Sequence, residues 1–136
     1  MTGVFADAVY WVALLNVNDS LHDRAARIST SLRNTRMITS DSVLTELLND
    51  FANRGAEKRM VASSLVEMLL DGREVTVERQ TPESFGAALE LYRIRPDKSW
   101  SITDCASFLI MKRYGIEHAL TYDHHFEQAG FKALLR

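Results

Sequence analysis

The sequence predicts an α/β domain whose mainly parallel sheet is covered by helices on both faces. Short strand-like runs (VFAD, MIT, EVTVER and HALTYD) alternate with longer segments of helical periodicity. Such alternation is typical of parallel strands joined by crossover helices. The length of 136 residues, with 46% hydrophobic and 25% charged residues, fits one compact domain. We therefore expect a single domain over residues 1–136, without internal repeats or a low-complexity linker.

The first half of the chain predicts two strands and four helices. A strand ending at Asp7 leads directly into the apolar segment AVYWVALLN, which suits a helix. MIT at residues 37–39 reads as a second strand closed by Ser40 and Asp41. Gly55 divides the next two helices. The apolar residues at helical spacing in the last three of these helices are Leu21, Ala25, Ile28, Leu32, Leu44, Leu48, Phe51, Val61, Leu65, Met68 and Leu69.

The second half predicts a strand at EVTVER and then a helix capped by Thr81 and Pro82. That helix is expected to turn its apolar residues inward; they are Phe85, Ala88, Leu89 and Tyr92. CASFLIM is apolar on every side and predicts a buried helix, entered through the polar residues SITD. HALTYD resembles a last inner strand, followed by a helical turn to Gly130 and a terminal strand at FKALL.

Charge and cysteine content exclude several classes of protein. Sixteen Lys and Arg residues against 18 Asp and Glu residues give a net charge of −2, so no overall positive field attracts nucleic acid. A single cysteine, Cys105, excludes an internal disulfide and a cysteine metal cluster. The N-terminus lacks a signal-like segment, and no apolar run approaches the ~20 residues that a bilayer requires. We expect a cytoplasmic protein with no membrane association.

Four acidic residues fall at one predicted edge of the sheet. Asp7 ends the first strand, and Asp123 ends the last inner strand. Glu46 lies one turn into a helix, and Asp104 begins the buried helix. Ligands of parallel sheets bind at the carboxyl ends of the strands. Clustered carboxylates repel one another and suit a hard divalent cation, which prefers oxygen ligands.

Each of these acids also has a purely structural explanation. Asp7 and Asp123 are placed to cap the helices that follow them, and Asp104 ends a capping-box pattern that starts at Ser101. Glu46 lies on the polar face of its helix, where solvent alone would satisfy it. Capping does not explain why all four fall at the same edge.

The four acidic segments together resemble a PIN domain, most closely the VapC-type bacterial toxins. The segments are FAD at residues 5–7, LTELLND around Glu46, SWSITDCASF around Asp104 and LTYDHHFEQAGF around Asp123. The terminal pattern T-x-D-x-x-F-x-x-x-G is the most specific of them. The resemblance runs over essentially the whole chain.

This resemblance implies a three-layer α/β/α sandwich with an acidic pocket that binds Mg²⁺ or Mn²⁺ and cleaves RNA. The residues that match the metal-site and catalytic acids are Asp7, Glu46, Asp104 and Asp123, and Thr121 matches the accompanying hydroxyl. The resemblance also implies a small antitoxin partner and a homodimer. One departure is Ala8, where members commonly carry Thr or Ser, and its loss affects a supporting hydrogen bond rather than a metal ligand.

Other polar residues near the predicted pocket are weaker candidates. Asn49 aligns with Glu46 and is a candidate supporting residue. Arg93, Arg95 and Lys98 form a basic cluster that would contact RNA phosphates, although a solvated loop explains them nearly as well. A role for Asp97 as a fifth acid is less favoured than solvent exposure.

Histidine, cysteine and tryptophan residues are assigned to structure rather than to catalysis. We interpret His124 and His125 as surface polarity beside a turn. Cys105 reads as a small buried hydrophobe, and Trp11 and Trp100 as packing residues.

Three alternatives to a toxin ribonuclease stay open. One is a housekeeping RNA-processing nuclease with the same acids. Another is a PIN fold that binds RNA or a partner without cutting it. The third is a phospho-acceptor signalling domain. Against it, this sequence has neither an acidic pair at the first predicted strand nor a lysine closing the last one, as such a domain would require.

Overall fold

The computed structural model describes residues 2–136, in which five parallel strands form one sheet in the order β3-β2-β1-β4-β5. The strands are β1 (Val4–Ala6), β2 (Met37–Ser40), β3 (Val75–Glu78), β4 (His118–Leu120) and β5 (Lys132–Ala133). The chain runs outward from β1 to β3 on one side and continues with β4 and β5 on the other. The strand order therefore reverses between β1 and β4, where open α/β sheets bind their ligands.

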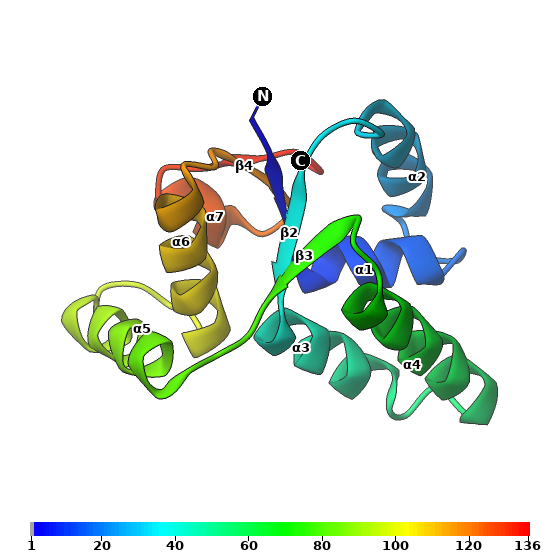
Figure 1. The fold of residues 1–136 in the computed structure, drawn as a ribbon, viewed down its shortest axis with the longest axis horizontal. Helices are drawn as coiled ribbons and strands as arrows, with labels where there is room; N and C mark the ends of the chain where they lie inside the picture. The colour runs from blue at the N-terminus through cyan, green and yellow to red at the C-terminus, as the bar shows by residue number, and fades with distance from the viewer. Residues whose placement is uncertain (1) are drawn as a thin grey trace.

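Helices cover both faces of this sheet, which confirms the predicted three-layer sandwich. The helices are α1 (Ala8–Leu15), α2 (His22–Ser31), α3 (Asp41–Phe51), α4 (Ala56–Asp71), α5 (Pro82–Ile94), α6 (Ile102–Tyr114) and α7 (His124–Gln128). Figure 1 shows α6 and α7 on one side of the sheet, and α1, α2 and α4 on the other. Helix α5 lies outside this sandwich, against α6. In residues 2–136 no helix has the length and apolar character needed to cross a membrane.

The core is centred on the strands and on α6. Phe5, Ile38 and Leu120 are fully buried on the three central strands. The ring of Phe108 on α6 meets the ring of Phe126 edge to face, with centroids 5.0 Å apart. The prediction of a buried helix at CASFLIM is confirmed, because Cys105 is fully buried there with Phe108.

The prediction for the inner face of α5 is wrong. Phe85, Leu89 and Tyr92 are 43%, 48% and 53% exposed, and only Ala88 of the predicted stripe is buried. Helical periodicity identifies an apolar stripe but not the element that covers it. Because α5 packs on α6 and not on the sheet, the small face containing Ala88 is the buried one.

The same error affects α4 at Val61 and Met68, which are 42% and 62% exposed. In α3, the predicted core residue Leu48 is 37% exposed, whereas the adjacent Leu47 is fully buried. Single apolar residues on a protein surface are common, so one-residue errors of this kind leave the helix assignments intact.

Capping side chains fix where the helices near the carboxyl edge of the sheet begin. Ser40 ends β2, and its Oγ accepts a hydrogen bond from the Val43 amide in the first turn of α3. Thr81 and Ser101 each complete a reciprocal capping box, at α5 and α6. The first turns of α3 and α6 are therefore held in place by their own side chains.

Candidate metal-dependent active site

Asp7 lies at the carboxyl end of the central strand, between β1 and α1, and is only 6% exposed. Its Oδ2 accepts a hydrogen bond of 2.9 Å from the Thr121 hydroxyl, which lies just beyond β4. Burial raises the pKa of Asp7 to about 7, although hydrogen bonds to its carboxyl group act in the opposite direction. The nearby charges of Asp104 and Glu46 add to the increase. Asp7 is thus a buried carboxyl group surrounded by other acids.

Glu46 faces the same region from the second turn of α3 and is partly buried. Its pKa is raised, first by burial and then by the charges of Asp104 and Asp123. A hydrogen bond from the side chain of Thr103 opposes this rise. The electrostatic coupling therefore links Glu46 to acids on two other segments.

Asp104 combines a capping role with a place in the acidic cluster. Its Oδ2 accepts a 3.0 Å bond from the Ser101 amide, and Ser101 Oγ accepts one from the Asp104 amide. The same Oδ2 lies 3.0 Å from Nδ1 of His125. The capping-box prediction is confirmed, and it does not prevent Asp104 from facing the other acids.

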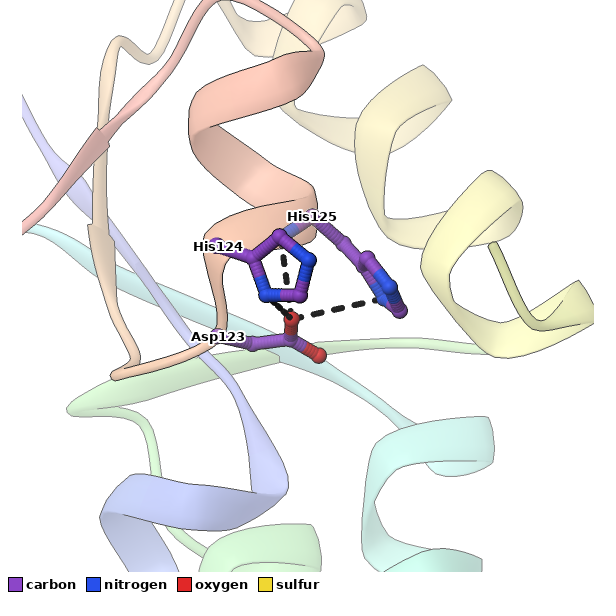
Figure 2. Close-up of side chains that lie close together, drawn as sticks. All are labelled: Asp123, His124 and His125. Carbon is purple, nitrogen blue, oxygen red and sulfur yellow. Dashed lines mark hydrogen bonds and ion pairs between the residues drawn. The ribbon is translucent and has the colours of Figure 1, made fainter. Parts of the chain in front are cut away.

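Asp123 closes the site from the start of α7. Its Oδ1 accepts a 2.9 Å hydrogen bond from the His125 amide and so caps α7. Figure 2 shows both histidine rings directed toward its carboxylate, with Nδ1 of His124 and of His125 at 3.7 and 3.3 Å from Oδ1. The Thr121 hydroxyl accepts a 3.0 Å bond from the Asp123 amide while it donates to Asp7. Thr121 therefore ties the first acid to the last.

The structure brings the four predicted acids to one edge of the sheet, where their charges interact. In the part of the chain that the structure describes, none of them forms an ion pair with Lys or Arg. Among residues 2–136, the groups able to carry positive charge that lie within ion-pair distance of these acids are the rings of His124 and His125. A set of carboxylates with unbalanced charge and oxygen donors fits a divalent cation.

The tightest group of potential ligands differs from the predicted four. Within residues 2–136, Asp123, His124 and His125 are the one group of three or more such residues whose ligand atoms all lie within 4.8 Å of one another. His124 is exposed, whereas the side chain of His125 is only 19% exposed. The four acids are spaced more widely, with His125 between Asp104 and Asp123.

Sequence reasoning missed His125. Its ring is half-buried between two of the acids, which does not agree with the prediction of surface polarity; His124, by contrast, is exposed as predicted. The available signal was the direct attachment of two histidines to Asp123 at the start of a helix. In the structure both rings lie against the Asp123 carboxylate, and His125 also reaches Asp104 on α6.

The weaker candidates lie at the margin of the site. Asn49 is exposed, and within residues 2–136 its side chain makes no hydrogen bond to an acid. Arg93 pairs with Glu90, while Arg95 makes two 3.0 Å bonds to Asp97. Arg95 holds the pKa of Asp97 at about 2, so Asp97 is an exposed ion-pair partner and not a fifth acid of the cluster.

Lys98 Nζ is 3.9 Å from the carboxylate of Asp97, so the predicted basic cluster is partly neutralised by an acid of its own loop.

The tryptophans pack as predicted: Trp11 is buried and its indole donates to Thr39, whereas Trp100 contacts Phe108 and donates to Gln128. Both indole rings are buried and so do not form an exposed stacking surface.

Comparisons with known proteins agree with this geometry. The family model described as the PIN domain matches residues 4–132. The 23S rRNA-specific endonuclease VapC20 of Mycobacterium tuberculosis is 30% identical over 128 residues, which cover 94% of this chain and 95% of that protein.

Solved structures give the same result for the fold. The crystal structure of M. tuberculosis VapC20, described as a Sarcin-Ricin loop cleaving toxin, superposes with a TM-score of 0.84 at 29% identity and covers 95% of this chain and 96% of that one. FitAcB from Neisseria gonorrhoeae gives a TM-score of 0.65 at 17% identity, with 96% and 95% covered, and supports the fold alone. The resemblance predicted from the acidic motifs is confirmed: this chain belongs to the PIN-domain family and is similar over nearly its whole length to a ribonuclease toxin.

Proposed function

We propose that this protein is a toxin endoribonuclease that cleaves RNA with Mg²⁺ or Mn²⁺ held by Asp7, Glu46, Asp104 and Asp123. The observation that carries the proposal is electrostatic. Asp7 is buried with a pKa raised to about 7, it is coupled to Glu46 and Asp104, and no Lys or Arg of the described residues pairs with these acids. Metal would remove the repulsion that the cluster otherwise stores.

A divalent cation at this site supplies an activated water and neutralises charge that develops on the phosphate oxygens. The side chains around the acids orient the carboxylates that would hold the ion. Thr121 fixes the carboxylate of Asp7 and the backbone of Asp123 at the same time. Nδ1 of His125 lies between Asp104 Oδ2 and Asp123 Oδ1, at 3.0 and 3.3 Å, and so links these two acids. Such supporting bonds typically affect metal affinity or activity by 10- to 100-fold.

The first test is metal dependence. Purified protein should cut RNA in Mn²⁺ or Mg²⁺, lose this activity in EDTA, and recover it when either ion is restored, because the cation would activate the attacking water. Gel analysis of 23S rRNA measures the cleavage, and Asp104→Asn prepared in parallel controls for contaminating nucleases. Cleavage that persists in EDTA would contradict the proposal.

The proposed substrate is ribosomal RNA, by analogy with the relative named for 23S rRNA cleavage. The place of action is then the cytoplasm. The basic cluster of Arg93, Arg95 and Lys98 is proposed to contact phosphates, for which Lys98 is the freest of the three. Phosphate contacts position a strand without reading its sequence. Asn49 remains a candidate supporting residue near Glu46.

A small antitoxin is the proposed protein partner. A cavity of about 290 Å³ beside Glu46 has an apolar wall formed by Ala8, Val9 and Val12 and an acidic rim formed by Glu46, Asp19 and Asp50. This combination favours an amphipathic peptide with basic residues, which would cover the acids. We also propose that the protein forms a homodimer.

Expression of the protein alone should therefore arrest bacterial growth, and co-expression of a small protein encoded beside it should restore growth. Asp104→Asn, expressed to the same level, should be harmless because the acidic site is incomplete. Colony counts after induction measure the effect. Harmless expression of protein that cleaves RNA in vitro would favour the housekeeping nuclease.

A further inference from the structure

A second cavity lies beside the acidic site, between the first turns of α3 and α5 and the middle of α6. Its volume is about 280 Å³. The apolar part of its lining comes from Ala87, Ala106, Leu109 and Ile110. The polar part includes Gln80 and five charged or hydroxyl-bearing positions of α3, β3, α5 and α6. A pocket with an apolar floor and a few polar groups is typical of small-molecule and base recognition.

The cavity continues from the acids along two helices. On α3, Ser42 lines the cavity and Glu46 faces the acids one turn later. On α6, Ala106 lines the cavity one turn after Thr103, whose side chain hydrogen-bonds to Glu46. Residues four or three apart lie on the same face of a helix, and one turn rises 5.4 Å. The cavity therefore borders the side of the acidic cluster formed by Glu46 and Thr103.

The polar groups of the cavity are arranged for a planar, hydrogen-bonding ligand. The side chain of Gln80 accepts a bond from Ser42 Oγ at 3.2 Å, which leaves its amide N–H groups to donate. Both Asp41 oxygens accept from the Gln80 backbone amide at 3.1 Å, so this segment is held in place. The N–H groups of an amide side chain can donate to acceptor atoms on a base edge.

Positive charge is also available at the rim. Within residues 2–136 Arg79 has no ion-pair partner, whereas Arg113 is paired with Glu78 at 2.6 Å. A free guanidinium can contact a phosphate or lie flat on a base. The cavity thus offers an apolar floor, amide donors and one free cation beside a site proposed to cut RNA.

We propose that this cavity receives one unpaired nucleobase of the RNA substrate, next to the scissile phosphate, and so contributes to the choice of cleavage position. The proposal rests on the proposed ribonuclease function. Sequence-specific RNA recognition targets splayed bases in loops, which bind by stacking and by their edges. The four acids are assigned to the metal, so a group that selects a base is sought in a neighbouring subsite.

The test combines a cavity-filling variant with single missing bases. The cut position of wild-type protein is mapped first, and short RNAs of that sequence are made with one abasic nucleotide at each of three positions on either side of the cut. At one position the loss of the base should lower wild-type kcat/KM by about 5- to 150-fold, the range expected for one stacked base. Ala87→Leu, which fills the cavity from the exposed side of α5, should lower cleavage of the intact RNA similarly and lose sensitivity to that abasic position.

Ala26→Leu is the matched control, because Ala26 is exposed on α2 and does not line the cavity. It should behave like wild type. Arg79→Ala keeps the cavity open and should therefore remain sensitive to the same abasic position as wild type. Its RNA affinity should depend less steeply on salt concentration, as expected when one phosphate contact is lost. This variant keeps the test valid if Ala87→Leu does not fold.

Three outcomes would overturn the subsite. In the first, wild type cleaves equally at every abasic position. In the second, Ala87→Leu keeps wild-type cleavage and sensitivity. In the third, Ala87→Leu changes the oligomeric state measured by light scattering, which would assign the cavity to an interface between two copies. Absence of any Mn²⁺-dependent cleavage by wild type would instead overturn the proposed function, and the subsite with it.

Discussion

Asp7→Asn should abolish RNA cleavage and, in the absence of metal, make the fold more stable near neutral pH. The loss of activity should exceed the 10- to 100-fold loss typical of residues that only support a metal ligand. The gain in stability follows from burial, which raises the pKa of Asp7 to about 7. Asparagine has nearly the same size, and its side-chain oxygen can still accept the hydrogen bond from Thr121.

The size of this gain in stability depends on pH. An unfolded aspartate loses its proton near pH 4, whereas folded Asp7 keeps it up to about pH 7. The folded state therefore binds more protons in this interval, and the stability of the wild type should fall as pH rises from about 4 to about 7. A difference of about three pKa units corresponds to at most about 4 kcal/mol.

Denaturant unfolding in EDTA between pH 4 and pH 8 measures this effect. Asp7→Asn should show a smaller fall than wild type, because Asp7 no longer contributes while Glu46, whose pKa is also raised, still does. Asp71→Asn, which alters an exposed acid at the end of α4, should retain the full fall. Parallel curves for wild type and Asp7→Asn would mean that Asp7 is not a buried charge in solution.

Adding Mn²⁺ should stabilise the wild type by about 2.7 kcal/mol at a hundredfold excess over its dissociation constant, since the ion binds the folded state alone. Asp104→Asn should gain clearly less. Asparagine can still occupy the start of α6, so lost capping should cost no more than about 1 kcal/mol and should not depend on metal. Melting temperatures with and without Mn²⁺ measure the difference.

Asp71→Asn is again the control, because its carboxyl group lies outside the cluster and the variant should show the full gain in stability. An equal gain in wild type and Asp104→Asn would assign Asp104 to helix capping alone. The comparison matters because the structure shows a complete capping box at this position, so geometry by itself supports both roles.

The architecture could be predicted because periodicity and strand-end signals are local. The strand ending before Asp7, the buried helix at CASFLIM and the capped start at Thr81 all follow from neighbouring residues. The exposure of Phe85 and Leu89 could not be predicted in this way. Whether an apolar stripe is covered depends on which distant element packs there, and α5 packs outside the sheet on α6.

In the candidate site, too, some features follow from local sequence signals and others depend on how distant elements pack. The gathering of Asp7 and Asp123 follows from a general rule, because parallel strands present their carboxyl ends at one edge. The position of His125 between Asp104 and Asp123 depends on the angle at which α7 leaves β4, which no local pattern specifies. The link between Asp7 and Thr121 joins residues 114 positions apart and likewise appears only in three dimensions.

That link also determines when the site can exist during protein synthesis. β1 is made first, yet one of its two neighbours, β4, and the hydroxyl that orients Asp7 come from the last fifth of the chain. A nascent chain that stops before residue 118 has only one side of its central strand paired and lacks the fourth acid. A nascent chain therefore cannot hold the complete acidic site until Asp123, the last of the four acids, has been made.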